Sequence, residues 1–129
     1  MSITINKGQL KPVKKKLKKG DAYVTVKPAT INDEGVRIEH LFAGESSSAY
    51  VTDIAVVEMW LTVIKSDILD ENSGPLFEAN MAFDDFVVGV TALLHELPDV
   101  FWEIHEKVRE ANPQWAPATE DAEKNAEGA

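Results

Sequence analysis

The strongest constraint on the fold of this chain is an apolar pattern of helical period in its middle. Apolar residues recur there at alternating steps of three and four, which places them along one side of a helix. They are Ile54, Val57, Leu61, Ile64 and Ile68. Val56, Trp60 and Val63 flank this row and widen it to roughly 160° of the helix circumference. We therefore expect a helix over residues 49–66 that packs against two partners, either two helices of this chain or one helix and another subunit.

The helical pattern ends in an acidic stretch that has the composition of a tight reversal. The stretch is Asp70-Glu71-Asn72-Ser73-Gly74-Pro75. Leu76 and Phe77 then return the chain to the apolar core. An acidic loop at the end of an apolar helix could also form the approach to an active site, but no nucleophile motif, metal set or phosphate loop accompanies it. We interpret the stretch as a structural turn that brings Leu76 and Phe77 back onto the helix that carries Trp60.

Two further helices are predicted after this turn. Asn80 suits the N-cap of the first, and the apolar seam that follows has the same three-four spacing. The seam is Phe83, Phe86, Val90, Leu93 and Leu97. Pro98 ends this helix and suits the first turn of the next, which is predicted over residues 98–111. The seam of that helix is Phe101, Ile104, Val108 and Ala111.

The last helix also carries a candidate contact surface. Trp102 projects about 100° away from the apolar seam, close to His105 and Arg109. A large aromatic side chain on a polar flank is typical of a partner-binding surface. The alternative is a half-buried tryptophan that packs on a loop or on the tail. We name Trp102 and Arg109 as candidate partner or self-association residues.

Before the helices, the pattern favours a short β element. Residues 22–26 are rich in strand-forming residues, and residues 36–42 alternate between apolar and other side chains. We interpret both runs as short strands. The competing interpretation starts a helix at Thr30 with Asp33 as its capping-box partner, and it places Gly35 inside that helix at a cost of ~1 kcal/mol.

Charge divides the chain into a basic beginning and an acidic remainder. The formal net charge is −9, but residues 1–20 carry seven lysines and no acid. The other 109 residues carry six basic and 22 acidic side chains, for a net charge of −16. A basic segment beside an acidic body can bind nucleic acid, an anionic surface or the acidic face of a second copy. The candidate partner residues in this segment are Lys14, Lys15, Lys16, Lys18 and Lys19.

These patterns predict one mainly α domain of about three helices with a short N-terminal β element. Residues 1–20 are interpreted as a flexible basic arm, because runs of like charge usually stay disordered. An arm that orders against an acidic partner is compatible with this interpretation. Residues 21–112 form the domain. Residues 113–129 are small, polar and acidic apart from Trp115, and we interpret them as a disordered acidic tail.

The sequence lacks the motifs of the common catalytic and cofactor sites. It has no cysteine, so neither disulfides nor thiolate chemistry is expected. Its three histidines do not form an HExxH helix, and its glycines do not form a phosphate-binding loop. We predict no metal, no cofactor and no enzymatic activity. No secretory signal and no apolar stretch of membrane-spanning length is present, so we expect a cytoplasmic protein without a membrane partner.

One combination of elements goes beyond these general features. A helix with a tryptophan is followed by an acidic turn with glycine and then by a Leu-Phe pair. The motif residues are Trp60, Asp70, Gly74, Pro75, Leu76 and Phe77. An extended segment that ends in proline, Val24–Pro28, precedes them. Over residues 22–112 this order of elements resembles the tail assembly chaperones of long-tailed, lambda-type bacteriophages, which are small, acidic, cysteine-poor proteins.

The resemblance implies a non-enzymatic function. Chaperones of this family coat the long tape-measure protein and keep it soluble until tail-tube subunits polymerise around it, and they act as rings or spirals. The implied partners are the tape-measure protein, the tail-tube protein and further copies of the chain. The implied location is the cytoplasm of the bacterial host, outside the finished virion. In this family a ribosomal frameshift commonly yields a longer form, and an acidic tail is a place where such an extension could begin.

A second hypothesis is a small regulatory or nucleic-acid-associated adaptor that uses the lysine-rich arm. The arm has no arginine and no interleaved aromatic residue, so it lacks base-reading and stacking groups. It would make a salt-sensitive contact that does not read sequence. Nucleic acid is therefore not the partner that we expect.

Overall fold

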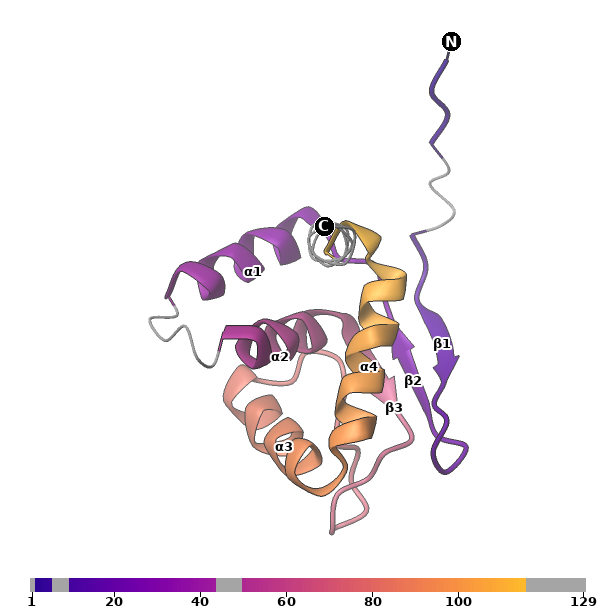
Figure 1. Cartoon of the computed structure of the whole chain (residues 1–129), viewed down its shortest axis with the longest axis vertical. Helices are drawn as coiled ribbons and strands as arrows, with labels where there is room; N and C mark the ends of the chain where they lie inside the picture. The colour runs from indigo at the N-terminus through magenta and orange to yellow at the C-terminus, as the bar shows by residue number, and fades with distance from the viewer. Residues whose placement is uncertain (1, 6–9, 44–49, 116–129) are drawn as a thin grey trace, which may run out of the picture.

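The computed structural model describes residues 2–5, 10–43 and 50–115, which form a mixed α/β fold (Figure 1). In chain order the elements are β1 (Val13–Lys16), β2 (Tyr23–Val26), α1 (Ile31–Ala43), α2 (Tyr50–Thr62), β3 (Val63–Ser66), α3 (Phe83–Glu96), α4 (Pro98–Ala111) and the 3-10 helix η2 (Pro113–Trp115). The expectation of a mainly α fold with about three helices and one short β element is wrong. The described residues form four α-helices and a three-stranded antiparallel sheet. α4 contacts β2 as well as α2 and α3, so it joins the sheet to the helices.

β2 is the central strand of the sheet, and β1 and β3 run antiparallel to it on either side. The pairing of β1 with β2 begins with Val13 opposite Val26. In the turn between them the backbone is left-handed at Gly20 (φ 67°) and at Asp21 (φ 55°), a conformation that glycine and aspartate tolerate better than most residues. The lysine-rich run is therefore one arm of a hairpin.

The flexible arm predicted for residues 1–20 is wrong where the hairpin forms. Val13–Lys16 are β1, and Leu17 is buried in the core. The like charges do not keep this segment disordered, because acidic side chains of α4 lie next to it: Lys15 Nζ is 3.2 Å from Glu110 Oε2. Alternation of β1 side chains then places Lys15 and Leu17 on the face toward α4 and leaves the other lysines of the strand outside.

α1 replaces the strand predicted over residues 36–42, so the strand interpretation is wrong and the competing helix is correct. The helix begins with the capping box named for it: Asp33 N donates to Thr30 Oγ1 (3.0 Å), and Thr30 N donates to Asp33 Oδ2 (2.9 Å). The strand-like alternation arose because apolar side chains also occupy the outer face of this helix. Ile38, for example, is 46% exposed.

α2 ends at Thr62, whereas the apolar pattern predicted a helix to residue 66, and the chain continues directly as β3. Two hydrogen bonds mark the change: Thr62 Oγ1 donates to the backbone oxygen of Glu58 (2.6 Å), and Lys27 N donates to Thr62 O (2.9 Å). Ile64 and Ile68 thereby leave the predicted seam. Helical spacing alone could not reveal this end, because pairing with β2 overrides the local pattern.

The reversal expected after β3 is present. Asp70 Oδ1 accepts hydrogen bonds from Asn72 N and Gly74 N, both at 2.9 Å, and Pro75 lies opposite Leu69 in an isolated bridge. The side chain of Phe77 then enters the core without exposed surface, and its ring centroid lies 5.2 Å from that of Phe86 on α3. The turn therefore delivers the Leu-Phe pair to the face of α3.

α3 and α4 lie close to their predicted positions. α4 has the predicted bounds, with Pro98 in its first turn. Asn80 is not the N-cap of α3: its backbone is left-handed (φ 64°), and Ala82 occupies the N-cap without a side-chain hydrogen bond. Leu97, assigned to the seam of α3, lies between the two helices and is 36% exposed.

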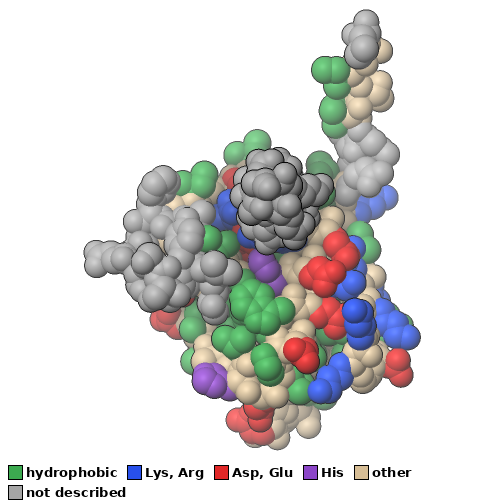
Figure 2. All heavy atoms as spheres, in the orientation of Figure 1, with side chains coloured by type: hydrophobic (Ala, Val, Ile, Leu, Met, Phe, Trp, Pro, Cys, Tyr) green, Lys and Arg blue, Asp and Glu red, His purple; other side chains and the backbone are tan. Residues whose placement is uncertain are grey.

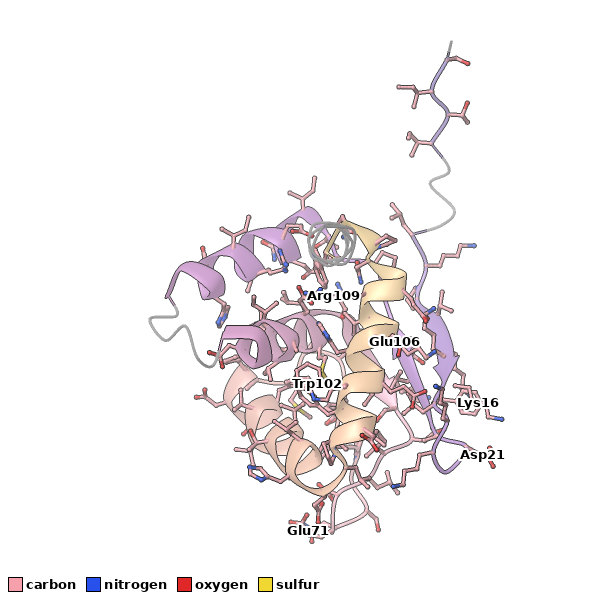
Figure 3. All side chains as sticks on the ribbon, in the orientation of Figure 1. Lys16, Asp21, Glu71, Trp102, Glu106 and Arg109 are labelled. Atoms are coloured by element: carbon pink, nitrogen blue, oxygen red, sulfur yellow. The ribbon has the colours of Figure 1, made fainter. Side chains whose placement is uncertain are left out.

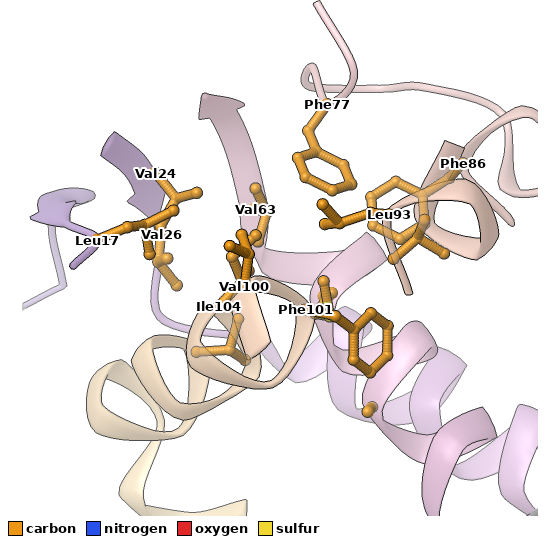
Figure 4. Close-up of a cluster of buried hydrophobic side chains, with 14 of the residues drawn as sticks. Leu17, Val24, Val26, Val63, Phe77, Phe86, Leu93, Val100, Phe101 and Ile104 are labelled. Atoms are coloured by element: carbon orange, nitrogen blue, oxygen red, sulfur yellow. The ribbon is translucent and has the colours of Figure 1, made fainter. Parts of the chain in front are cut away.

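The core fills the space between the sheet, α2, α3 and α4 (Figure 4). Its buried members are Leu17, Val24, Val26, Ala55, Met59, Val63, Phe77, Phe86, Val90, Leu93, Val100, Phe101, Ile104, Val108 and Trp115. Trp115 belongs to this set although it was assigned to the disordered tail, because η2 turns its side chain back against the fold. Residues 116–129 lie outside the described residues.

Candidate functional site

Trp102 lies on the outward side of α4, where it is 40% exposed (Figure 3). Its ring packs edge-on against the buried ring of Phe101, with the centroids 4.7 Å apart. One side of the indole therefore contacts the core, and the other side faces solvent. It borders a hollow of about 570 Å³ between α4 and the β1–β2 turn. The lining residues are Lys18, Lys19, Asp99, Val100, Trp102, Glu103 and Glu106. The hollow therefore has an apolar side and a rim with charges of both signs.

The β1–β2 turn is fixed beside Trp102 by a backbone contact. Lys18 N donates to both carboxylate oxygens of Glu103, at 3.1 and 3.0 Å. The carboxylate of Glu103 is therefore bonded to the backbone of the turn, and the side chains of Lys18 and Lys19 line the rim of the hollow. Figure 2 shows acidic and basic side chains interleaved over α4 and the hairpin, which fits this pattern.

The structure does not bring the five candidate lysines into one free patch. Lys18 and Lys19 line the hollow with Trp102. Lys15 is paired with Glu110, and its side chain is 22% exposed. Lys14 Nζ lies 4.4 Å from the centroid of the Tyr23 ring, and Lys16 Nζ lies 3.3 Å from Asp21 Oδ1 at the end of the hairpin (Figure 3). Only the first pair shares a surface with the tryptophan.

Two neighbouring lysines, Lys15 and Lys107, stabilise the ionised form of Glu110. Burial raises the pKa of this carboxyl group, but the hydrogen bond from Lys15 and the charge of Lys107 outweigh burial, and the pKa lies below its ordinary value. Lys107 Nζ is 3.5 Å from the second carboxylate oxygen. α4 thus neutralises part of the basic strand within the chain.

Arg109 is not part of the surface of Trp102. It belongs to a buried ionic network centred on Glu58 of α2, whose side chain has no exposed surface. Arg109 Nε donates to Glu58 Oε1 (3.1 Å), His105 Nε2 lies 2.7 Å from the same oxygen, and Arg37 Nη2 of α1 lies 2.8 Å from Oε2. Figure 3 shows Arg109 on the side of α4 that faces α1 and α2. The network joins three helices through one carboxylate.

The environment keeps Glu58 ionised. Burial raises the pKa of its carboxyl group, but the hydrogen bonds from His105 and Arg109 and the charges of both residues outweigh burial, so the pKa lies below its ordinary value. Arg37 Nε donates to Oε2 at 2.9 Å, which completes the coverage of both oxygens. A carboxylate with both oxygens occupied has no free lone pair directed at a substrate, so this network is suited to holding helices and not to general base chemistry.

Trp115 covers the network from the end of the described chain. The Arg37 guanidinium lies 5.0 Å from the centroid of the Trp115 ring, and Trp115 Nε1 donates to Glu34 Oε1. Stacking of a guanidinium on an indole face is favourable. α1 is therefore held by Glu58 through Arg37, and by Trp115 through Arg37 and Glu34.

Sequence reasoning missed Glu58, Arg37 and His105 as a group. The available signal was a single acid inside an otherwise apolar helix, which indicates a buried charge that needs a cationic partner. The i,i+4 spacing of His105 and Arg109 on α4 was a second signal. The partner on α1 could not be found, because residues 36–42 were assigned to a strand.

Trp60, the tryptophan of the predicted motif, lies in a second hollow of about 500 Å³ near the end of α2. Its Nε1 donates to Met81 O (2.8 Å), and its ring meets Phe83 edge-on with the centroids 4.8 Å apart. Lys27 and Asp33 also line this hollow, but they are paired with each other at 2.5 Å. We assign a structural role to Trp60, which joins α2 to the segment before α3.

Within residues 2–5, 10–43 and 50–115, no group of three or more histidine, cysteine, aspartate or glutamate side chains is placed to hold a metal ion. None of the helices in the same ranges is both long and apolar enough to cross a membrane. Comparisons with protein-family models, with curated proteins and with solved structures found no match.

Proposed function

We propose that this chain is a non-enzymatic tail assembly chaperone of a long-tailed bacteriophage. It binds the tape-measure protein and keeps it soluble while tail-tube subunits polymerise. The proposed setting is the cytoplasm of the bacterial host, and the chaperone is absent from the finished virion. Copies of the chain, the tape-measure protein and the tail-tube protein are the proposed partners, without nucleic acid or a membrane.

The hollow beside Trp102 is the observation that carries the proposal. A long helical client presents rows of apolar side chains flanked by charges. In the hollow, the aromatic side chain of Trp102 packs on the apolar core, and the rim contains Lys18, Lys19 and Glu106. Half-exposed tryptophans are frequent anchors of binding surfaces, because they bury a large area with little loss of side-chain freedom.

Co-expression with a tape-measure protein tests the proposal. The native chain should raise the soluble fraction of the client and co-purify with it. Trp102→Glu should weaken binding by about 30-fold or more, since a tryptophan anchor contributes about 2 kcal/mol or more. Val88→Glu is the matched control, because Val88 is 72% exposed on α3 and lies outside the hollow. Failure of the native chain to bind or solubilise tape-measure proteins overturns the proposed function.

A further inference from the structure

The segment Ser2–Ile5 leads away from the fold as an extended chain (Figure 1). Two of its four residues are isoleucines with nearly full exposure: Ile3 is 88% exposed and Ile5 is 77% exposed. Ser2 and Thr4 alternate with them, so one side of the segment is apolar and the other is polar. Two exposed isoleucines at strand spacing suit a segment that can pair as a strand and bury its apolar side.

The sheet has one open edge for such a segment in the described part of the chain. β2 is central, and the outer side of β3 carries a bridge between Lys65 and Glu78. The outer edge of β1 has no strand beside it among the described residues. An unpaired strand edge presents backbone donors and acceptors to any chain that can lie alongside it.

We propose that Ser2–Ile5 of one copy adds to the outer edge of β1 in a second copy and forms a fourth strand there. The four residues of Ser2–Ile5 suffice to pair along the whole of Val13–Lys16. Pro12 lacks an N–H group and sets the limit of the pairing at the start of β1. This surface is separate from the hollow beside Trp102 and does not depend on the proposed function.

Charge explains why this segment, and not a second β1, would occupy the edge. Pairing of two β1 strands would place lysines opposite lysines, which is unfavourable. Ser2–Ile5 carries no charge. The lysines of β1 thus discourage edge-to-edge association of two sheets and still accept an uncharged strand.

The side chains of the added strand also find suitable surroundings. A hollow of about 400 Å³ lies beside β1 on the face toward α4, and exposed apolar side chains contribute to its lining. Among them are Leu10, which is 69% exposed, and Val13, which is 48% exposed. Ile3 and Ile5 would lie against this hollow, while Ser2 and Thr4 would point to the opposite face, where Lys14 and Lys16 lie.

A copy of the chain is a better occupant than the segment's own strand. Seven residues, 6–12, connect Ile5 to Val13, the first residue of β1. To lie along its own β1, the segment would have to fold back through this connection, whereas in the structure it leads away from that strand (Figure 1). Addition to a second copy needs no reversal, because the segment already points outward (Figure 1).

Engineered cysteines distinguish the two arrangements, because the native chain has no cysteine. Thr4→Cys is placed in one copy, and Lys14→Cys or Lys16→Cys is placed in a second copy of different length. After mild oxidation we expect a mixed disulfide in at least one of these combinations. Lys65→Cys, on the far strand of the sheet, is the control that should not react. Absence of a mixed disulfide in both test combinations overturns the proposal.

A second measurement uses the alternation of the segment. Ile3→Glu with Ile5→Glu should weaken self-association in solution by at least tenfold, whereas Ser2→Glu with Thr4→Glu should preserve it, since those residues face lysines. Both double variants add the same charge, and neither alters a residue of the folded core. Equal effects of the two variants, or a native chain that stays monomeric at high concentration, overturn the proposal. Because the purified chain is tested alone, this result is independent of client binding.

Discussion

Replacement of Glu58 by glutamine tests whether the buried network holds the helices together. The carboxylate has no exposed surface, and it receives hydrogen bonds from Arg37 and Arg109 while His105 contacts the same group. Glutamine keeps the shape of the side chain but removes the charge. Its amide nitrogen would also direct two N–H donors toward guanidinium groups that are themselves donors. The variant therefore leaves two arginines without a counter-charge.

The expected loss follows from the burial of the partners. Removal of one member of a buried ion pair typically costs about 3–5 kcal/mol, because the remaining charge is left uncompensated. The side chains of Arg37 and Arg109 retain 17% and 22% exposure, so water can partly solvate them. We expect the lower end of this range, about 3 kcal/mol. Domains of this size have stabilities of about 5–15 kcal/mol, so the change should be large.

Urea denaturation followed by circular dichroism measures the effect. With a slope of about 2 kcal/mol per molar urea, a loss of 3 kcal/mol lowers the midpoint by about 1.5 M. Glu39→Gln is the control, because Glu39 is an exposed acid on α1 and its replacement should change stability by less than about 0.5 kcal/mol. A loss below about 1 kcal/mol for Glu58→Gln, with an unchanged slope, would refute the reasoning: an uncharged side chain would then satisfy the site as well as the carboxylate does.

Two further predictions concern acid and the backbone. Burial raises the pKa values of Glu58, Asp33 and Glu110, but their cationic and hydrogen-bonding partners outweigh it, so the folded-state pKa values lie below the ordinary ones. The stability that these carboxylates provide should be complete above about pH 5 and should be lost as the pH falls through the folded-state pKa values. The loss should be smaller in Glu58→Gln, which lacks one of the three carboxylates. Urea denaturation at several pH values measures this, and an equal dependence of the unfolding free energy on pH in both proteins would contradict it. Gly35→Ala should raise stability by about 0.5–1 kcal/mol, because the residue lies inside α1 and an added Cβ meets nothing within 4 Å. Gly20→Ala should lower it by about 1–2 kcal/mol, because φ is 67° there; thermal melts that shift in the same direction for both variants would be the contrary result.

Local signals were sufficient where the chain makes its own contacts. Pro98 and the seam that follows it predicted the bounds of α4, because a proline in the first turn and apolar spacing act within one helix. The turn around Asp70 is also local, since its carboxylate bonds to nitrogens two and four residues away. The capping box of Thr30 and Asp33 is a local signal too, and it marks the start of α1, whereas the alternation after it favours a strand that does not form.

Local signals failed where a distant segment decided the outcome. The end of α2 depends on β2, which pairs with Val63–Ser66 and interrupts a continuous helical pattern. The lysine segment forms the ordered strand β1 because it contacts α4: Lys15 pairs with Glu110, and the backbone N–H of Lys18 bonds to Glu103. Composition indicated repulsion within that segment, and it contained no information about acids that lie 85 to 95 residues further along the chain.

The sequence by itself determined the helical core segments, the acidic turn and the separation of basic and acidic charge, because propensity, spacing and charge are properties of neighbouring residues. Only the tertiary structure decided the three-stranded sheet, the burial of Glu58 and the position of Trp115. Each of these depends on long-range partners: a strand needs another strand to satisfy its backbone, and a buried carboxylate needs cations that the fold brings from other helices. The same distinction holds for the candidate surface. Trp102 could be identified from its place outside the apolar seam, whereas its neighbours Lys18 and Lys19 reach it only because the hairpin packs against α4.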